Sequence, residues 1–385
     1  MGFRNRLFQP PGQSFFLFGP RGTGKSTWLR RTYPDALFID LLNDDTFRAY
    51  SARPQRLADV LAGHAGPPGI VVVDEIQRVP SLLPVVHLLI ESRKDLLFVL
   101  TRSSARKLKR SGTDLPAGRA VLRTMHPYMA VELGRAFDFE MCLQTGLVPV
   151  VVESPEPGDT LASYAGLYVR EEVMAEGLVR NVGDFTRFLE SAALSHGSVL
   201  NTANISRECE VKRKTVEGYL SIIEDLLLAI RLRVFSRRSR RALASHPKFY
   251  LFDVGVFRSL LPSGPLYTQS NTEGAALEGL VLQHLRAWIA YSRKSLELYY
   301  WRTRAGAEID FILYGEDGFY ALEVKCAPRV RPEDLRALKS FKADYPEAAP
   351  ILLYRGKERL LHEGILCLPI EEFICRLHPS RNLED

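Results

Sequence analysis

The sequence predicts an α/β protein with more than one domain, and three observations support this prediction. Over residues 14–130, short apolar runs alternate with segments of helical periodicity, a pattern typical of a mostly parallel sheet covered by helices. A glycine-rich segment follows the first apolar run, and a second group of strand-like runs lies near the C-terminus. At 385 residues the chain is too long for a single hydrophobic core, so two or three domains are expected.

The first α/β segment contains alternating predicted strands and helices. Each predicted strand is a short run of aliphatic and aromatic residues, and polar residues or glycines separate these runs. Strands are expected at residues 14–18, 36–41, 69–74, 96–101 and 120–125, and helices at residues 26–33, 54–62, 81–92 and 105–110.

The composition is that of an ordinary soluble globular protein. Hydrophobic residues make up 46% of the chain and charged residues 25%, and no apolar run approaches the length of a membrane span. The five cysteines lack the paired spacing of a zinc site or a disulfide framework, which fits a reducing compartment. We therefore expect a cytoplasmic protein with no membrane partner. The net charge of +6 is compatible with a polyanionic partner but does not establish one.

The glycine-rich segment fits the phosphate-binding loop pattern of a glycine, four residues and then Gly-Lys-Ser. Glycines let the backbone curl so that its N–H groups face the phosphates, and the lysine adds a positive charge. The serine offers its hydroxyl to Mg²⁺ at the start of a helix, whose positive end favours anions. A glycine-rich surface turn is the alternative. The residues predicted to bind ATP here are Gly19, Gly22, Gly24, Lys25, Ser26 and Thr27.

The third predicted strand ends in two carboxylates, Asp74 and Glu75. Such a strand lying beside a phosphate loop can point the first carboxylate at Mg²⁺ and the second at the water that attacks the γ-phosphate. We therefore predict that Asp74 holds Mg²⁺ together with Ser26 and that Glu75 is catalytic. A carboxylate pair at a strand end is also common as plain surface. The next strand ends at Thr101, whose side chain could sense the γ-phosphate.

A candidate DNA-binding segment follows residues 151–160, which are rich in proline, glycine and acid and predict a linker. Two short helices with a turn near Glu210 would place basic residues at the start of the second helix, where helix-turn-helix proteins meet DNA. A strand-like run at residues 230–235 and a basic segment at residues 237–241 complete a winged-helix pattern. A structural spacer is the alternative. The predicted nucleic-acid contacts are Lys212, Arg213 and Lys214.

The C-terminal strands have a second chemical pattern. Residues 298–313 are predicted to form a hairpin, followed by a third strand. Asp310 and the Glu323-x-Lys325 triplet match the pattern of PD-(D/E)xK nucleases, in which the acids hold Mg²⁺ and the lysine positions or deprotonates water. Glu278, on a preceding amphipathic helix, would complete the metal site. A Glu-x-Lys triplet alone is more often a solvated strand edge.

The sequence resembles the bacterial and archaeal AAA-family ATPases that carry a C-terminal domain of unknown function called DUF4143. The motifs that carry this resemblance are residues 19–27, 73–80, 100–104, 118–119 and 126–127. The resemblance covers residues 12–375 and is most specific in the nuclease-like part at residues 301–311. In that family the fourth-strand motif usually reads Thr-Gly-Ser-Ser, and Arg102 replaces the glycine in this chain. The predicted fold is α/β: a P-loop AAA-type ATPase domain, then a winged helix-turn-helix and a PD-(D/E)xK nuclease-like α/β domain.

We expect the P-loop ATPase domain at residues 1–150, a linker and bridging helices at 151–195, the winged helix at 196–265 and the nuclease-like domain at 266–385. The predicted function is ATP binding and hydrolysis, with ATP and Mg²⁺ as cofactors, coupled to DNA binding and Mg²⁺-dependent phosphodiester cleavage. One alternative is an NTP-driven switch that binds DNA or protein partners and has a catalytically silent nuclease-like domain. Another is a nuclease-fold domain that binds other proteins and no nucleic acid. Arg119 could complete the ATP site of a neighbouring copy, which would make the protein a homo-oligomer.

Overall fold

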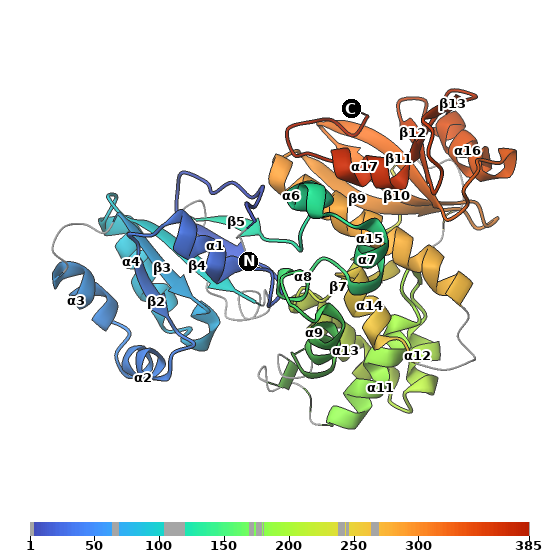
Figure 1. The fold of residues 1–385 in the computed structure, drawn as a ribbon. Coiled ribbons are helices and arrows are strands. Elements are labelled where there is room, and N and C mark those ends of the chain that lie inside the picture. Colours follow the sequence, from blue (N-terminus) through green and yellow to red (C-terminus); the bar gives the residue numbers. More distant parts are fainter. Residues whose placement is uncertain are drawn as a thin grey trace. The chain divides into compact units, whose positions relative to one another are not determined.

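The computed structural model describes residues 4–63, 69–103, 120–168, 173–174, 179, 181–237, 243, 246–262 and 269–384. The chain forms two compact units, whose elements are shown in Figure 1. The smaller unit comprises residues 8–126 and 225–227, and the larger unit comprises residues 1–7, 127–224 and 228–385.

A five-stranded parallel sheet forms the centre of the smaller unit, which confirms the predicted parallel α/β arrangement. The strand order is β2-β3-β4-β1-β5. Because β4 lies between β1 and β3, the strand that contains Thr101 is the direct neighbour of the phosphate-loop strand, and the strand that ends at Asp74 is one place further away. The strands are β1 (Phe15–Phe18), β2 (Leu37–Asp40), β3 (Ile70–Asp74), β4 (Leu97–Arg102) and β5 (Val121–Thr124).

Helices cover this sheet because their apolar faces pack against its buried side chains. One cluster joins Phe16, Val71 and Leu100 of the sheet to Leu57 and Val86 of the helices. The helical elements are α1 (Lys25–Thr32), α2 (Asp44–Ala52), α3 (Arg56–Gly63), the 3₁₀ turn η1 (Ile76–Arg78) and α4 (Leu82–Ser92). The predicted helix at residues 105–110 and the predicted contact Arg119 lie outside the described residues.

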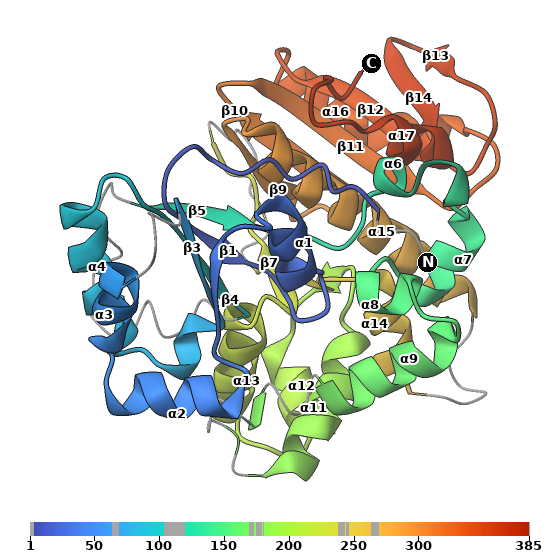
Figure 2. The ribbon, with the colours of Figure 1, turned by 60° about the vertical axis from the view of Figure 1, so that its left-hand side comes forward.

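A six-stranded mixed sheet dominates the C-terminal part of the larger unit, with the order β13-β14-β12-β11-β10-β9. β10 pairs antiparallel with β9 and β11, whereas β12 is parallel to β11 and β14. Leu338 and Phe341 of α16 pack on this sheet, and α15 runs beneath it in both views (Figures 1 and 2). The elements are α15 (Gln269–Ser292), β9 (Leu296–Arg302), β10 (Glu308–Gly315), β11 (Gly318–Lys325), η4 (Pro332–Leu335), α16 (Arg336–Asp344), β12 (Ala349–Tyr354), β13 (Leu360–His362), β14 (Ile365–Pro369) and α17 (Ile370–Arg376).

A smaller antiparallel sheet, with the order β6-β8-β7, lies in the same unit. Along the chain, its elements run helix, strand, two helices and two strands. The two central helices are joined by a turn in which Glu210 has a left-handed φ of 55°. The predicted pair of helices is therefore present, and the winged-helix assignment stays a prediction. The elements are α11 (Val182–Ala193), β6 (Ser198–Val199), α12 (Thr202–Glu208), α13 (Arg213–Asp225), β7 (Ala229–Leu232) and β8 (Lys248–Leu251).

Short helices make up much of the rest of the larger unit. Residues 151–160, predicted as a linker, include the end of α8 and the start of α9. Across the described ranges, no helix combines the length and the apolar character needed to cross a membrane. These elements are α6 (Ala130–Leu133), η2 (Gly134–Ala136), α7 (Phe139–Thr145), α8 (Pro149–Val152), α9 (Pro157–Ser163), the π-helical turn η3 (Tyr164–Tyr168) and α14 (Val254–Leu260).

The connection between β7 and β8 runs along β9, the edge strand of the six-stranded sheet. The backbone N–H of Phe235 donates to the Tyr300 carbonyl oxygen at 2.7 Å, and the Tyr300 N–H donates to the Arg233 carbonyl oxygen at 3.1 Å. The Phe235 ring is 1% exposed and packs with Tyr299 in the aromatic core. The start of the predicted wing therefore covers a sheet edge. Residues 238–242 of this segment lie outside the described residues.

A buried histidine links α15 to α6 within the larger unit. His284 Nε2 accepts the backbone N–H of Ala130 at 3.0 Å, and Nδ1 lies 2.8 Å from the Leu280 carbonyl oxygen. These partners require a neutral ring with its proton on Nδ1. Burial lowers the pKa of His284 to about 4, so the ring stays neutral near pH 7.

Phe235→Ala is expected to destabilise the larger unit by about 3–5 kcal/mol, because it removes a fully buried aromatic ring and leaves a cavity. Urea denaturation followed by circular dichroism measures this change. Leu361→Ala is the matched control, since Leu361 is 76% exposed on β13, and it should cost less than about 0.5 kcal/mol. Equal small effects of the two variants would show that Phe235 does not anchor the connection.

The neutral His284 should make the larger unit sensitive to acid. Its folded pKa of about 4 lies below the ordinary value of 6.5, so its contribution to stability is complete above pH 6.5 and is lost as the pH falls towards 4. A pKa shift from 6.5 to about 4 corresponds to about 3 kcal/mol of unfolding free energy. The difference in unfolding free energy between wild type and His284→Gln should therefore shrink as the pH is lowered through this window. A difference that is independent of pH would contradict the prediction.

Candidate functional site

The phosphate loop joins the end of β1 to the start of α1, and its glycines meet specific backbone requirements. Gly22 and Gly24 have φ values of 80° and 83°, in the left-handed region that favours glycine. Gly19 is required for a different reason, because a Cβ atom at this position would lie 2.5 Å from the carbonyl oxygen of Met125. The local sequence is therefore matched to a tight loop.

Lys25 is buried at the first residue of α1, and carbonyl oxygens of the loop surround its ammonium. Nζ donates to the carbonyl oxygens of Gly19 at 2.7 Å and Pro20 at 3.2 Å. These acceptors have no formal charge, and the ammonium also interacts electrostatically with the Asp74 carboxylate, whose pKa it lowers. Ser26 and Thr27 follow in the first turn, Ser26 partly buried and Thr27 exposed. The helix N-terminus adds to the positive potential of the loop.

Asp74 and Thr101 meet near the carboxyl ends of β3 and β4. The Thr101 hydroxyl donates to Asp74 Oδ1 and accepts the backbone N–H of Glu75, the latter at 2.8 Å. Burial raises the pKa of Asp74, while side-chain hydrogen bonds with Ser26 and Thr101 oppose the shift. Ser26 and Asp74 thus lie together and offer the oxygen donors that Mg²⁺ prefers. These residues fit the ion that the resemblance implies at the phosphate loop.

Glu75, directly after β3, has a backbone conformation that is rare for a residue with a Cβ atom. Its φ of 58° lies in the left-handed region, and such strain often occurs at functional sites. Its carboxylate accepts hydrogen bonds from Gln77 Nε2 and from Ser103 Oγ, the latter at 3.2 Å. Gln77 also donates to Ser103 at 3.0 Å. No role was predicted for Gln77 or Ser103, although both lie within the motifs of the family resemblance.

Arg102, which replaces the usual glycine of the family motif, has a side chain that is only 1% exposed. It lies opposite Phe18 in the parallel register of β4 with β1. Phe18 is the last residue before the phosphate loop. Arg102 therefore places a buried guanidinium on β4, and β4 is the neighbour of β1, the strand that precedes the phosphate loop.

The predicted acidic ligands of the larger unit come from three different elements and lie in one buried cluster. Glu278 is on α15, Asp310 on β10 and Glu323 on β11. Asp310 Oδ2 accepts the backbone N–H of Val324 at 3.0 Å, which ties β10 to β11. Burial and the neighbouring Asp310 carboxylate raise the pKa of Glu278 to about 8, and the same two causes raise the pKa of Glu323. Such a cluster favours a bound proton or cation.

A lysine that no motif predicted lies among these acids. Lys248 Nζ is 2.7 Å from Glu278 Oε1, 2.7 Å from Glu308 Oε1 and 2.9 Å from Asp310 Oδ1. Tyr250, two residues later on β8, donates its hydroxyl to Glu278. Burial lowers the pKa of Lys248, but the surrounding groups, Asp310 first, outweigh it and raise this pKa overall. The lysine is therefore an ammonium.

Glu323 and Lys325 lie on the same side of β11, as strand alternation predicts. Lys325 Nζ donates to Glu323 Oε1 at 2.5 Å. Glu323 is 6% exposed, and its second oxygen, Oε2, has no hydrogen-bond partner among the described residues. The predicted catalytic lysine is thus paired with one of the two predicted catalytic acids.

The family resemblance implies Mg²⁺ among Glu278, Asp310 and Glu323, and this arrangement does not fit the ion. Mg²⁺ binds carboxylate oxygens at about 2.0–2.1 Å. Two of the oxygens that would coordinate it already surround the Lys248 ammonium. In the ranges that the structure describes, no group of three or more His, Cys, Asp or Glu side chains could hold a metal ion.

The predicted nucleic-acid contacts, Lys212, Arg213 and Lys214, are all exposed around the start of α13. Arg213 Nε lies 3.1 Å from Glu217 Oε1, one turn further along the helix. In the basic segment after β7, Arg237 stacks over the Tyr314 ring at 4.8 Å. The other arginines of that segment, and the basic residues 106–110, lie outside the described residues.

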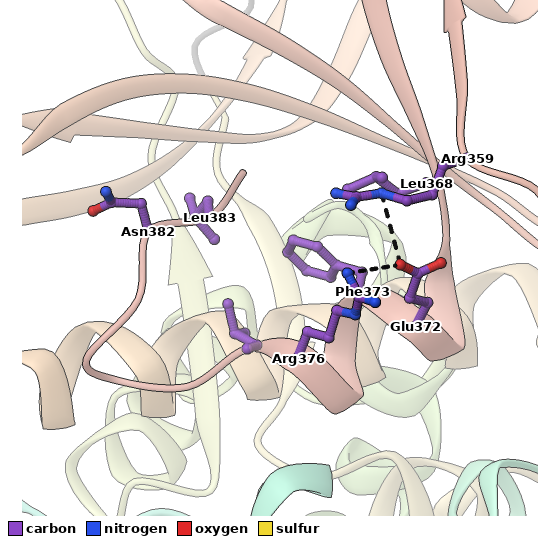
Figure 3. A pocket seen from close by; sticks show the side chains of 8 residues that line it. Arg359, Leu368, Glu372, Phe373, Arg376, Asn382 and Leu383 are labelled. Carbon is purple, nitrogen blue, oxygen red and sulfur yellow. Dashed lines mark ion pairs between the residues drawn. The ribbon is translucent and has the colours of Figure 1, made fainter. Parts of the chain in front are cut away.

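A small pocket lies between α17 and the C-terminal segment (Figure 3). Arg359 Nε and Arg376 Nη1 both approach Glu372 Oε1, at 3.6 Å and 3.2 Å. The two cations share one carboxylate, and none of the predicted site residues lines the pocket. The other lining residues are Leu368, Phe373, Leu377, Asn382 and Leu383.

Family models match three consecutive parts of the chain. A model described as AAA domain matches residues 12–134, and one described as Domain of unknown function (DUF4143) matches residues 273–373. Both agree with the resemblance seen in the sequence. A further model, Domain of unknown function (DUF8612), matches residues 136–266. This segment contains the predicted linker and helix-turn-helix, and no such family was predicted for it.

The chain is 26% identical over 368 residues to uncharacterised proteins of Mycobacterium bovis and Mycobacterium tuberculosis, covering 93% of this chain and 80% of each relative. A structure of C. elegans PCH-2 matches 55% of this chain and 61% of its own, with 13% identity and a TM-score of 0.24. A Vibrio cholerae protein matches 90% of this chain and 96% of its own, with 10% identity and a TM-score of 0.22. These TM-scores are too low to define a fold or a function.

Gly19→Ala is expected to weaken ATP binding by about tenfold or more, a change of at least ~1.4 kcal/mol, because the new methyl group would collide with the Met125 carbonyl oxygen. Fluorescence titration with a labelled ATP analogue measures the affinity. Gly12→Ala is the control, since a Cβ atom there has nothing within 4 Å. Unchanged affinity in Gly19→Ala would show that this loop geometry does not hold the nucleotide.

Proposed function

Because the chain is an AAA protein with a C-terminal DUF4143 domain, we propose that it binds and hydrolyses ATP at the loop of residues 19–27. An AAA domain implies nucleotide binding, usually with Mg²⁺. The observation that supports hydrolysis is the convergence of a glycine loop, a buried lysine and two acidic residues near the carboxyl ends of parallel strands. Ligands of open parallel α/β sheets bind at such edges.

In this proposal, the loop binds the phosphates of ATP. The backbone N–H groups around Gly19, Gly22 and Gly24 face the phosphates, and Lys25 adds its ammonium. Ser26 and Asp74 would hold Mg²⁺, which neutralises phosphate charge when it is bound, and Thr27 extends the first turn of α1 at the exposed side of the loop.

The second acidic residue has a different proposed role. Glu75 orients or activates the attacking water, and Gln77 and Ser103 hold its carboxylate for this purpose. Thr101 holds Asp74 through its hydroxyl and Glu75 through the backbone N–H. Thr101 would therefore respond to the γ-phosphate through these two residues.

For the larger unit we propose nucleic-acid binding under the control of the ATPase, with a nuclease-like domain that does not cut. The observation that favours this reading is the lysine at the centre of the acidic cluster. The sequence predicts cleavage by Asp310, Glu323 and Lys325, and we do not propose it. The proposed contacts with DNA phosphates are Lys212, Arg213 and Lys214, since all three are exposed around the start of α13.

Lys25→Ala should abolish ATP binding, because the buried ammonium of the loop is lost. Glu75→Gln should still bind ATP but hydrolyse it about 10²-fold or more slowly, because the amide cannot activate water. Phosphate release and nucleotide binding are measured in parallel on both variants. Arg53→Ala is the control, since its side chain is 69% exposed. Full ATPase activity in Glu75→Gln would disprove the assigned role of Glu75.

Replacing Lys212, Arg213 and Lys214 together by alanine should weaken DNA binding. If all three contact phosphates, the slope of log affinity against log salt should fall by about 2–3. Fluorescence anisotropy at several salt concentrations gives this slope. The matched control replaces the exposed residues Arg329, Arg331 and Lys357, which removes the same charge from another surface. An equal loss in both triple variants would indicate a general effect of charge rather than a contact at α13.

A further inference from the structure

We infer that the Lys248 ammonium is the resident cation of the acidic cluster and takes the position in which a divalent metal ion would bind. The inference concerns the larger unit and does not depend on the proposed ATPase activity. The native cluster therefore takes no Mg²⁺ or Mn²⁺, and it becomes a divalent-metal site only when Lys248 is replaced.

The geometry around Nζ supports this inference. Three carboxylate oxygens, from Glu278, Glu308 and Asp310, lie 2.7–2.9 Å from the lysine nitrogen. A metal ion bound to the same oxygens would sit about 2.0–2.2 Å from them, in the space that the ammonium fills. Because the two cations would also repel each other, the cluster can hold one or the other and not both.

The backbone of β8 fixes the lysine at this place. Lys248 pairs with Val199 of β6 and Leu232 of β7, so its strand is the central strand of the three-stranded sheet. Side chains two residues apart on a strand share a face, and both Lys248 and Tyr250 reach Glu278 from this strand. Lys248 is 2% exposed, so its ammonium lies away from solvent and among the acids.

The cluster retains oxygen donors for a metal ion once the lysine is gone. Glu323 Oε2 is buried and has no hydrogen-bond partner in the described part of the chain. Together with Glu278, Glu308 and Asp310, Glu323 would present carboxylates from α15, β10 and β11. Hard divalent cations such as Mg²⁺ and Mn²⁺ prefer such oxygen donors.

The test is a Mn²⁺ titration of the full chain without nucleotide, followed by electron paramagnetic resonance. All proteins carry Asp74→Asn, so that the phosphate loop does not contribute the signal. The Lys248→Met variant should bind Mn²⁺, with a rise in melting temperature on metal addition, and Asp310→Asn should remove both effects. The protein with native Lys248 should show no Mn²⁺ binding that depends on Asp310.

Removal of a buried cation leaves its acids unpaired, so Lys248→Met alone could fail to fold. The double variant Lys248→Met with Glu308→Gln removes the lysine together with one of the acids paired with it and is tested in the same way. Mn²⁺ binding to native Lys248 protein that is lost in Asp310→Asn would overturn the inference. A folded Lys248→Met protein, or the folded double variant, that takes no Mn²⁺ would overturn it as well. So would metal-dependent DNA cleavage by the wild type that Asp310→Asn abolishes.

Discussion

A buried ammonium must be surrounded by oxygen atoms, and the kind of oxygen decides what the site can do. Lys25 is held by the carbonyl oxygens of Gly19 and Pro20, which have no formal charge. Lys248 is held by three carboxylates. Lys248 thus lies among acids, whereas the hydrogen-bond acceptors of Lys25 are neutral and its interaction with Asp74 is electrostatic. The two lysines are similarly buried, at 5% and 2% exposure, but their hydrogen-bond acceptors differ in charge.

The glycine-rich loop between β1 and α1 could be predicted from the sequence because its requirements are local. The spacing of Gly19, Gly24 and Lys25 is a property of a few consecutive residues, and the parallel sheet follows from the alternation of apolar runs and helices. The position of β4 between β1 and β3 could not be predicted in this way, because strand order depends on pairing between distant segments. The contacts of Gln77 and Ser103 with Glu75 depend on that order.

In the larger unit the strands that hold Asp310, Glu323 and Lys325 lie where the alternating pattern predicts them. The Lys248 ammonium that lies near these acids could not be predicted from the sequence. Lys248 is 30 residues from Glu278 and 62 residues from Asp310 along the chain. No short motif contains residues so far apart. Phe235 shows the same limit: the sequence indicates a strand-like run, but only the fold reveals that this run continues along β9. The segment predicted to be a wing is thereby joined to the C-terminal sheet.

The left-handed backbone conformation of Glu75 affects which amino-acid substitutions evolution favours at this position. A residue with a Cβ atom costs about 1 kcal/mol or more in that conformation, and glycine does not. A Glu75→Gly substitution would therefore relieve this backbone strain and remove the carboxylate. Under the proposed catalytic role, a glutamate kept at position 75 costs stability and retains the carboxylate that acts on water. Relatives that have lost hydrolysis but kept the sheet would be expected to release this strain, so the residue after β3 would distinguish working ATPases from nucleotide-binding remnants.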